Sequence, residues 1–251
     1  MRENETEQNI VFGIHPVMEA IESGKEIEKV FLKKESTNPA INEIKRTLKS
    51  KRIPFQEVPQ EKLFRLTRKN HQGVIALLSP IEYQNFDEVV RRVIESGEAP
   101  LVLVLDRVSD VGNFGAICRS AECAGVHAIL IPIKGSAQIN SYAVKSSAGA
   151  IFNIPICRTG HILSEVRNLQ GAGLRVVACS EKGEDTIYNS NLSGPMAIIM
   201  GSEEDGIGEG LLEIAKEHIS IPMAGTTGSL NVSVATGIVL FERLRQASHV
   251  G

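Results

Sequence analysis

The sequence has few of the residues that most often define a site by themselves. Among its 251 residues there is no tryptophan, and aromatic residues make up only 4%. This scarcity argues against base stacking as the main route to a nucleic-acid partner. Hydrophobic residues make up 42% and charged residues 23% of the chain, as in ordinary globular proteins. A chain of this length can bury a core in one large domain or in two smaller ones.

Cysteines and long apolar runs are also scarce. The four cysteines form no Cys-x-x-Cys pair, and no apolar run reaches the roughly 18 residues that a membrane span needs. The polar, acidic start MRENETEQN does not read as a secretory leader, so we expect a reduced, cytoplasmic protein with no membrane partner. Cys118, Cys123 and His127 could suggest a metal site, but they fall on a helical stretch that leads into a strand. We therefore expect core cysteines and no metal.

The formal net charge of -3 hides an uneven distribution of charge. Residues 1–85 hold 14 Lys and Arg against 12 Glu, whereas residues 86–251 hold 13 basic against 18 acidic residues. Nine basic and two acidic residues lie from Lys45 to Lys69, which predicts one strongly positive surface in the front part of the chain. Such a run is either a solvated helix face or the footprint of a polyanion.

The front part of the chain is predicted to form a small α/β domain. The segment IVFGIHPVMEAIESG is typical of a short strand, a turn and a helix, and three further strands are predicted at IEKVFLKK, IPFQEVP and GVIALLSP. Basic helices are predicted between them, at PAINEIKRTLKSK and EKLFRLTRKN. We assign this domain to residues 1–82 and place a polar linker and a connecting helix at residues 83–99.

Strands and helices alternate more plainly in residues 100–251. Buried parallel strands are predicted at LVLVLD, HAILIP, LRVVAC, MAIIMG and HISIPM, which are rich in apolar residues, and a weaker one at IFNIPI. Helical segments separate them, including AVKSSAGA, and the last is LNVSVATGIVLFERLRQ. This alternation predicts an α/β fold with an open parallel sheet and helices on both of its faces.

Three polar, glycine-containing loops begin where predicted strands end. They are RVSDVGNFGAICRSAECAG, GSEEDGIG and AGTTGSLN. Ligands of parallel α/β sheets bind at the carboxyl edge, so three such loops predict one site, with polar side chains from Asn113, Arg119, Glu203, Ser229 and Asn231. The chain has no Gly-x-Gly-x-x-Gly or Gly-x-x-x-x-Gly-Lys-Ser/Thr motif, which disfavours a Rossmann dehydrogenase or a P-loop NTPase.

These loops carry a resemblance to a known family. The segments DRVSDVGNFGAICRSAECAG, IIMGSEEDGI and ISIPMAGTTGSLNVSVATGIVLFE resemble the three motifs of the SpoU family of RNA ribose 2′-O-methyltransferases, also called the TrmH family. The similarity runs from about Leu101 to Gln246. In the front part, IVFGIHPVMEAIESG and KNHQGVIAL look like the family's substrate-binding domain, which resembles a ribosomal-protein RNA-binding fold. The segment SAQINSYAVKSSAGA is most similar to members that methylate a guanosine ribose of large-subunit ribosomal RNA.

The resemblance implies a fold, a cofactor and a partner. The fold is a knotted parallel-sheet catalytic domain whose C-terminal segment threads through a loop, and this domain packs into a homodimer. The cofactor is S-adenosylmethionine, with contacts at Gly201, Ile221, Leu230 and Cys179. The partner is large-subunit ribosomal RNA. Transfer RNA as substrate, a catalytically silent RNA-binding protein and a small-molecule enzyme remain the alternatives.

The resemblance gives Arg119 the catalytic role, with two readings left open. As a general base, its guanidinium would have to lose a proton that is held with a pKa above about 12. As an electrostatic group, it would grip the target phosphate and stabilise the developing 2′-alkoxide. Asn113 and Glu203 would hold Arg119 and the ribose in place.

Ser229 and Asn231 lie where the last predicted helix begins. On spacing alone, Ser229 is expected to be the helix N-cap, and the resemblance adds that both side chains orient the ribose or the arginine. The basic stretch is in turn interpreted as the RNA-binding surface, with contacts predicted at Lys45, Lys49, Lys51, Arg52, Arg65, Arg68 and Lys69.

Overall fold

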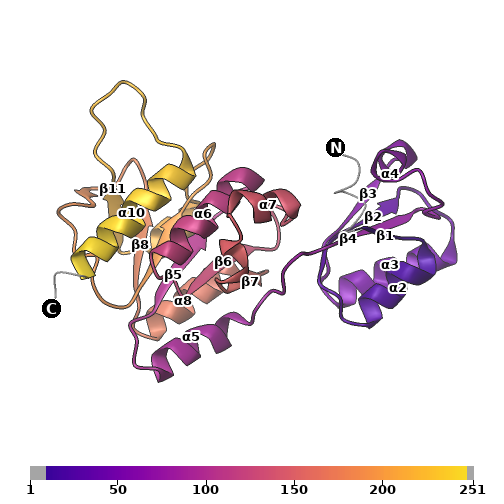
Figure 1. The fold of residues 1–251 in the computed structure, drawn as a ribbon, viewed down its shortest axis with the longest axis horizontal. Helices are drawn as coiled ribbons and strands as arrows, with labels where there is room; N and C mark the ends of the chain where they lie inside the picture. Colours follow the sequence, from indigo (N-terminus) through magenta and orange to yellow (C-terminus); the bar gives the residue numbers. More distant parts are fainter. Residues whose placement is uncertain (1–9, 248–251) are drawn as a thin grey trace. The chain divides into compact units, whose positions relative to one another are not determined.

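The computed structural model describes residues 10–247, which form two compact units (Figure 1). Unit 1 comprises the described residues up to Glu82 together with Ile139–Ser141 and has a four-stranded sheet. Unit 2 comprises Tyr83–Gln138 and the described residues from Tyr142 onward and has a seven-stranded sheet. No helix within residues 10–247 is long and apolar enough to cross a membrane. The two sheets explain how each unit positions its polar side chains.

The sheet of unit 1 is mixed, with the strand order β1-β4-β2-β3. Strand β4 (Val74–Leu78) pairs antiparallel with β1 (Ile10–Phe12) and with β2 (Ile27–Lys33). Strand β2 pairs parallel with β3 (Phe55–Val58). Because side chains alternate along each strand, the sheet has two apolar faces, and both need to be covered.

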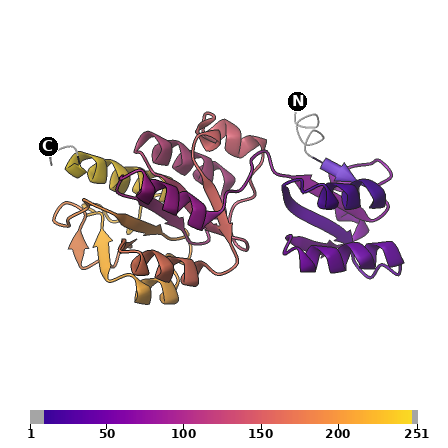
Figure 2. The same cartoon turned by 90° about the horizontal axis from the view of Figure 1, so that it is seen from below.

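Helices cover the two faces of this sheet unequally. The longer helices α2 (Ile14–Glu22) and α3 (Pro39–Ser50) lie together on one face (Figures 1 and 2). The short helix α4 (Gln60–Leu66) lies on the other, where Leu63 packs against Phe31. The core of unit 1 is therefore split in two by the sheet.

Unit 2 has the parallel sheet that its Val- and Ile-rich runs predict. The strand order is β7-β6-β5-β10-β8-β11-β9. All neighbouring strands pair in parallel. The strands are β5 (Leu101–Leu105), β6 (Ala128–Pro132), β7 (Ile156–Thr159), β8 (Arg175–Cys179), β9 (Asp185–Thr186), β10 (Met196–Met200) and β11 (Glu217–Ser220). This register brings the carboxyl ends of β5, β8 and β10 level with one another.

Two local predictions in unit 2 are wrong in detail. Helix α7 (Ser141–Ser146) starts and stops earlier than predicted, since Ala148 (φ 51°) and Gly149 (φ 85°) take left-handed backbone conformations. The first half of the predicted strand IFNIPI is the 3-10 helix η1 (Ala150–Phe152), so that β7 starts only at Ile156. The edge strand β9 was not predicted, because two residues are too few to show an alternating pattern.

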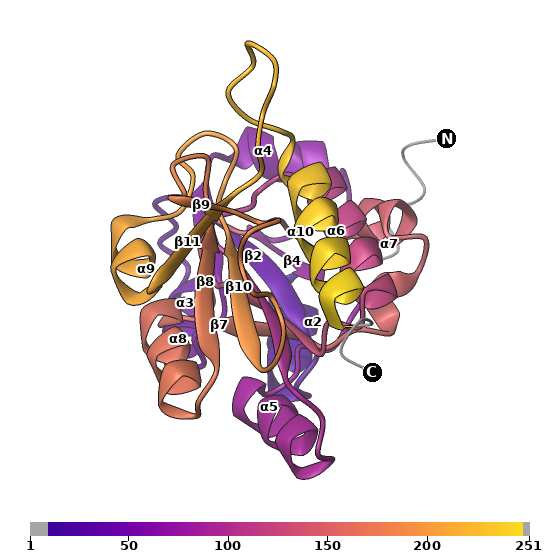
Figure 3. The same cartoon turned by 90° about the vertical axis from the view of Figure 1, so that its left-hand side faces the viewer.

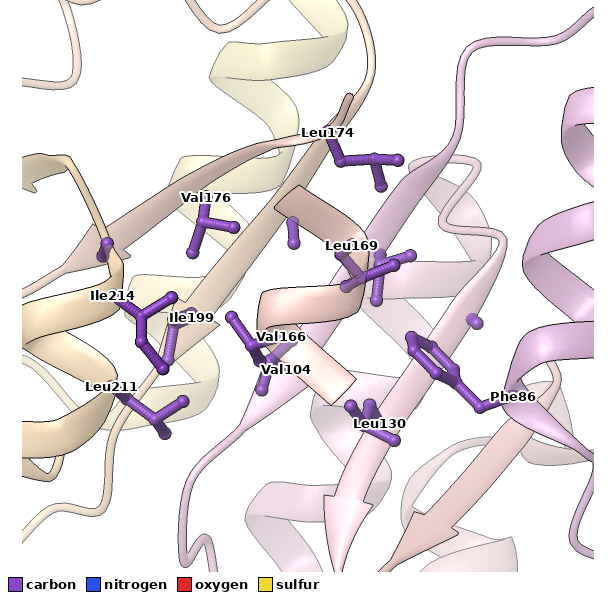
Figure 4. Packing of buried hydrophobic residues seen from close by; sticks show 14 of the residues in the cluster. Phe86, Val104, Leu130, Val166, Leu169, Leu174, Val176, Ile199, Leu211 and Ile214 are labelled. Carbon is purple, nitrogen blue, oxygen red and sulfur yellow. The ribbon is translucent and has the colours of Figure 1, made fainter. Parts of the chain in front are cut away.

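Helices lie on both faces of the large sheet, as predicted (Figure 3). Helices α5 (Phe86–Glu95), α8 (Ile162–Gly171) and α9 (Glu209–Ile214) cover one face, and Phe86, Val166 and Leu211 from these helices share one buried cluster with strand side chains (Figure 4). Helices α6 (Val111–Cys123) and α10 (Val232–Ala247) pack side by side on the other face. The threading of the C-terminal segment through a loop stays a prediction.

The C-terminal turn of α10 is firmly held. The buried carboxylate of Glu242 accepts hydrogen bonds from Arg245 (2.7 and 2.8 Å) and from Gln246 (2.8 Å), which lower the pKa of Glu242 to about 2. Gln246 also donates to the carbonyl oxygen of Ser190 at 3.1 Å and accepts from the amide of Leu192 at 2.8 Å. These bonds fix the helix whose first turn enters the candidate site.

Candidate active site

A hollow of about 460 Å³ lies where the loops after β8, β10 and β11 meet. Its lining comprises residues 179–182, 200–207, 221, 223, 228–230, 232 and 235. The loop between β11 and α10 extends far from the rest of unit 2 (Figures 1 and 3). The two later polar loops of the sequence therefore share one hollow, and a loop after β8 joins them.

Gly201 shapes the bottom of the loop that follows β10. A Cβ atom built on this glycine would overlap the backbone of Gly206 and Ile207. The close approach is a tight turn in which Ser202 and Gly206 exchange two backbone hydrogen bonds of 3.1 Å. The side-chain hydroxyl of Ser202 also accepts from the amide of Asp205 at 3.0 Å. Only glycine lets the two arms of this loop touch, and residues from both arms line the hollow.

Asp106 and Arg107 brace the same loop, although sequence reasoning assigned them no role. The buried carboxylate of Asp106 accepts a 2.7 Å hydrogen bond from the amide of Gly208. Arg107, in a left-handed conformation (φ 60°), contacts the Asp205 carboxylate at 3.3 Å and the Gly206 carbonyl oxygen at 3.4 Å. Both residues follow β5 directly, at the start of DRVSDVGNFG. Their position at the end of a strand is the sequence feature that could have identified them as site residues.

Three of the predicted catalytic side chains form one hydrogen-bonded network. One carboxylate oxygen of Glu203, Oε1, accepts from Asn113 Nδ2 at 3.0 Å and from Asn231 Nδ2 at 2.6 Å. Asn231 Nδ2 also donates to Asn113 Oδ1 at 3.0 Å. Within residues 10–247, the second oxygen of Glu203 has no hydrogen-bond partner. The network joins the first turns of α6 and α10 to the loop after β10 and leaves one acceptor oxygen unused.

Asn231, and not Ser229, is the N-cap of α10. Its Oδ1 accepts from the amides of Ser233 at 2.9 Å and Val234 at 3.4 Å, which is the geometry of a capping side chain. The expectation that Ser229 caps the helix is wrong, because α10 begins only at Val232. Ser229 is exposed and lines the hollow. The spacing predicted a cap two residues before the one observed, and therefore predicted the wrong side chain.

All four predicted cofactor contacts line the hollow. Gly201, Ile221, Leu230 and Cys179 come from three different loops, and the structure brings them together. Burial, aided by the charge of Glu181, raises the pKa of Cys179 to about 12. Its side chain is therefore a neutral thiol that forms part of the wall, and not a nucleophile. Within residues 10–247, no three His, Cys, Asp or Glu side chains are grouped as metal ligands.

Arg119 does not join the network in a single chain. It lies six residues after Asn113 on α6, about 9 Å further along the helix axis, and points to another side of the helix. The side chain is exposed, and within residues 10–247 it has no hydrogen-bond or ion-pair partner. The expectation that Asn113 and Glu203 hold Arg119 finds no contact in this structure, because both are bonded to Asn231 instead.

The basic stretch of unit 1 does not form one surface. Lys45 and Lys49 belong to α3, and Arg65 belongs to α4, so the sheet separates them. On the α3 side, Lys45 pairs with Glu57 at 2.7 Å and Lys51 donates to the carbonyl oxygen of Ile21 at 3.0 Å. Arg52 is exposed in the turn after α3, and Arg68 and Lys69 are exposed in the loop after α4. The RNA contacts predicted from Lys45 to Lys69 thus do not share one face, because the chain crosses from one face to the other between α3 and α4.

Comparison with known families identifies the two units. The model of the SpoU rRNA Methylase family matches residues 100–241, and the model described as RNA 2′-O ribose methyltransferase substrate binding matches residues 10–84. The chain belongs to the SpoU rRNA methylase family. The family, the enzyme class and the α/β methyltransferase fold that the three motifs predicted are therefore confirmed.

Individual relatives cover nearly the whole chain. Two proteins named 23S rRNA (guanosine-2′-O-)-methyltransferase RlmB are similar to it. The one from Escherichia coli K12 is 37% identical over 95% of this chain and 99% of its own length. The one from Photorhabdus laumondii is 39% identical over 95% of this chain and 98% of its own length. Among solved structures, the SpoU methyltransferase AviRb from Streptomyces viridochromogenes in complex with AdoMet has a TM-score of 0.60 and 25% identity, covering 98% of this chain and 94% of that one.

Proposed function

We propose that this protein transfers a methyl group from S-adenosylmethionine to a ribose 2′-hydroxyl of ribosomal RNA, with a guanosine of 23S rRNA as the target. The observation that carries the proposal is the Asn113–Glu203–Asn231 network at the rim of the hollow. Relatives named for this reaction are 37–39% identical over nearly the full length. We also propose a cytoplasmic location, because the proposed substrate is ribosomal RNA.

The hollow suits the proposed cofactor in size and chemistry. Its volume of about 460 Å³ lies within the range of small-molecule sites, roughly 300 to 1,000 Å³. Ile221 and Leu230 offer apolar walls for an adenine ring, and the close-approach turn at Gly201 forms another part of the lining. A solved SpoU structure that holds AdoMet matches 98% of this chain. When bound, S-adenosylmethionine supplies an electrophilic methyl group on a sulfonium.

The network orients the acceptor ribose. Because Glu203 Oε1 is held by two amide groups, the carboxylate cannot rotate freely, and its second oxygen is directed by the same constraint. That oxygen is the proposed acceptor for the ribose 2′-hydroxyl. Alignment of a hydroxyl with the methyl carbon accounts for several kcal/mol of the barrier, and this is the main contribution expected of the site.

Arg119 is proposed to act across a homodimer. Val234 and Phe241, one face of α10, are 50% and 48% exposed, which is unusual for large apolar side chains and favours a second copy packed on α10. Ser120, the neighbour of Arg119, lies against Gly237 of α10. A partner packed on α10 would bring its own Arg119 toward this chain's site. There the guanidinium would hold the target phosphate and stabilise the developing alkoxide, and it would keep its proton.

Methyl transfer to isolated RNA tests the function. The protein is incubated with labelled S-adenosylmethionine and ribosomal RNA from a strain that lacks this enzyme, with transfer RNA and protein-free samples in parallel, and the modified ribose is mapped. We expect label at one ribose of 23S rRNA only. Label in transfer RNA alone would overturn the substrate assignment, and label in neither RNA would leave a silent RNA-binding protein.

Arg119→Lys separates the two roles of the arginine. An electrostatic role predicts partial activity, because lysine keeps the positive charge, and an unchanged pH–rate profile. A general-base role predicts a profile that moves to lower pH, since the pKa of a lysine, about 10.4, lies below that of arginine. Arg119→Ala is the reference for complete loss of the group.

A further inference from the structure

The two faces of unit 1 differ in charge as well as in their helices. Helices α2 and α3 together hold three basic and three acidic residues, so their net charge is zero. Part of that basic charge is already used, since Lys45 pairs with Glu57 at 2.7 Å. Lys51, just after α3, is bonded to the last turn of α2. The helices that cover this face therefore offer little net positive charge to a polyanion.

The opposite face, here called the α4 face, is strongly basic. It comprises α4, the loop that follows it and the β2 side chains that share the side of Phe31, and its basic residues are Lys29, Lys33, Lys62, Arg65, Arg68 and Lys69. Glu61 is the acidic residue of α4. Six positive charges thus face one acid, whereas the helices α2 and α3 on the other face carry no net charge.

Aromatic rings lie among these charges. The ammonium of Lys62 is 5.2 Å from the ring centroid of Phe31, and that of Lys69 is 5.9 Å from the centroid of Phe12. Phe64, on α4, is 48% exposed, which leaves part of its ring open to a flat partner. A positive surface with an open aromatic ring is the pattern expected for a single-stranded or looped nucleic acid.

One buried donor on the α4 face lacks an acceptor. The Nδ1 atom of His71 accepts a 3.0 Å hydrogen bond from the amide of Gly73, so the neutral ring carries its proton on Nε2. His71 Nε2 is buried and has no partner within residues 10–247. The ring packs edge-on against Phe64, with centroids 5.0 Å apart. An unpaired N–H beneath an exposed ring indicates a place where an acceptor oxygen would be favourable.

We propose that RNA docks on the α4 face of unit 1 and not on the α2 and α3 face. This rests on the proposed function, because it assigns the RNA of that reaction to one side of the substrate-binding unit. Lys62, Arg65 and the loop basic residues contact phosphates, and Phe64 stacks on an unpaired base. Charge supplies most of the affinity, in keeping with the small number of aromatic residues.

Two matched double variants test the proposal in the full-length protein. Lys62→Glu/Arg65→Glu reverses two charges three residues apart on α4, and Arg46→Glu/Lys49→Glu makes the same change on α3. Binding to unmethylated 23S rRNA transcript is measured over a range of salt concentrations. For the α4 pair we expect about a tenfold or greater loss in affinity and a salt slope reduced by about 1.5, since each of the two phosphate contacts contributes about 0.7 to 0.9. For the α3 pair we expect less than about a twofold change.

Further measurements keep the outcomes distinct. Affinity for S-adenosylmethionine is expected to stay unchanged in both pairs, and Lys62→Gln/Arg65→Gln replaces the α4 pair if charge reversal prevents folding. An equal or larger loss for the α3 pair overturns the docking face. Normal RNA binding by both double variants would also overturn the docking face. In that case, methylation of 23S rRNA by the wild type would still support the proposed function. A wild type that neither binds nor methylates 23S rRNA overturns both.

Discussion

In the candidate site of unit 2, residues far apart in the sequence lie close together in the structure, whereas in the basic stretch of unit 1, residues close in the sequence lie apart. Asn113 and Asn231 are 118 positions apart, yet their side chains hydrogen-bond at 3.0 Å. Lys49 and Arg65 are 16 positions apart, yet they lie on opposite sides of a sheet. Distance along the chain thus says little about which side chains share a surface, and the type of sheet says much more.

The difference follows from how each sheet is connected. In unit 2 every strand runs the same way, so Leu105 and Cys179 both stand level with Met200, and the loops that follow start at one edge. In unit 1 the chain leaves α3, passes through the edge strand β3 and enters α4 on the other face. A parallel sheet gathers distant loops, whereas a single strand between two helices can separate near neighbours.

The largest effect is expected from breaking the network that unit 2 gathers. In Asn231→Ser the serine still caps α10, but the amide that donates to Glu203 and Asn113 is lost. We expect kcat/KM for methyl transfer to fall about 100-fold, because a small misplacement of the acceptor costs that much. Single-turnover kinetics with saturating cofactor measure the change.

Asn231→Gly is the control, because glycine tolerates the cap position at a cost of only a few tenths of a kcal/mol but also lacks the amide. The free energy of unfolding of both variants is expected to lie within about 1 kcal/mol of the wild-type value. Both are expected to lose activity to a similar degree. Full activity in Asn231→Ser would show that the network holds the helix only.

A second, somewhat smaller effect concerns the turn at the bottom of the hollow. In Gly201→Ala the new methyl group would overlap the backbone of Gly206, so the loop has to open. We expect a loss of about 1 to 3 kcal/mol in the free energy of unfolding, as for other overpacked sites. We also expect weaker binding of S-adenosylmethionine, measured by calorimetry.

Gly228→Ala provides the matched control for this change. Gly228 lines the same hollow, but a Cβ atom built there meets no atom within 4 Å. Cofactor affinity should therefore change less than about twofold. If the two variants bound S-adenosylmethionine equally well, the close approach at Gly201 would have no role in shaping the site.

Sequence reasoning could predict the sheet of unit 2 and much of its site. Continuous Val- and Ile-rich runs identify buried parallel strands, and polar loops at their ends point to one edge. The resemblance to the three motifs named Asn113, Glu203 and Asn231 as site residues, and Gly201, Ile221 and Leu230 as cofactor contacts. The structure joins the first three in one network and places the other three around one hollow. The strands of unit 2 and the loops of its site can be predicted because each is encoded by a short, continuous stretch of the sequence.

Other features depend on side-chain detail that no pattern carries. Ser229 and Asn231 are both good caps, and only the starting residue of α10 decides between them. The left-handed conformation of Arg107 and its contact with Asp205 are set by packing at a strand end. The separation of Lys49 from Arg65 requires knowing which face each helix covers.

The smallest expected effect concerns the pH dependence of unit 1. Burial, together with the charge of Lys33, lowers the pKa of His71, so the ring stays neutral to a lower pH in the folded protein than in the unfolded chain. In the unfolded chain the ring takes up a proton as the pH falls through about 6.5. Acid therefore favours unfolding. The stabilisation is complete above about pH 6.5 and is lost as the pH falls toward the lower pKa of the folded state, by at most about 1.4 kcal/mol per pH unit.

His71→Asn isolates this contribution, because its Oδ1 replaces the Nδ1 acceptor for Gly73 but does not titrate. Hydrogen exchange of the β4 amides, which follow His71 directly, reports the opening of unit 1 in the full-length protein. Between about pH 7.5 and pH 5.5, we expect the wild type to lose more protection than the variant. Equal losses would mean that His71 is protonated without cost in the folded state, and the unpaired Nε2–H would then say nothing about the α4 face.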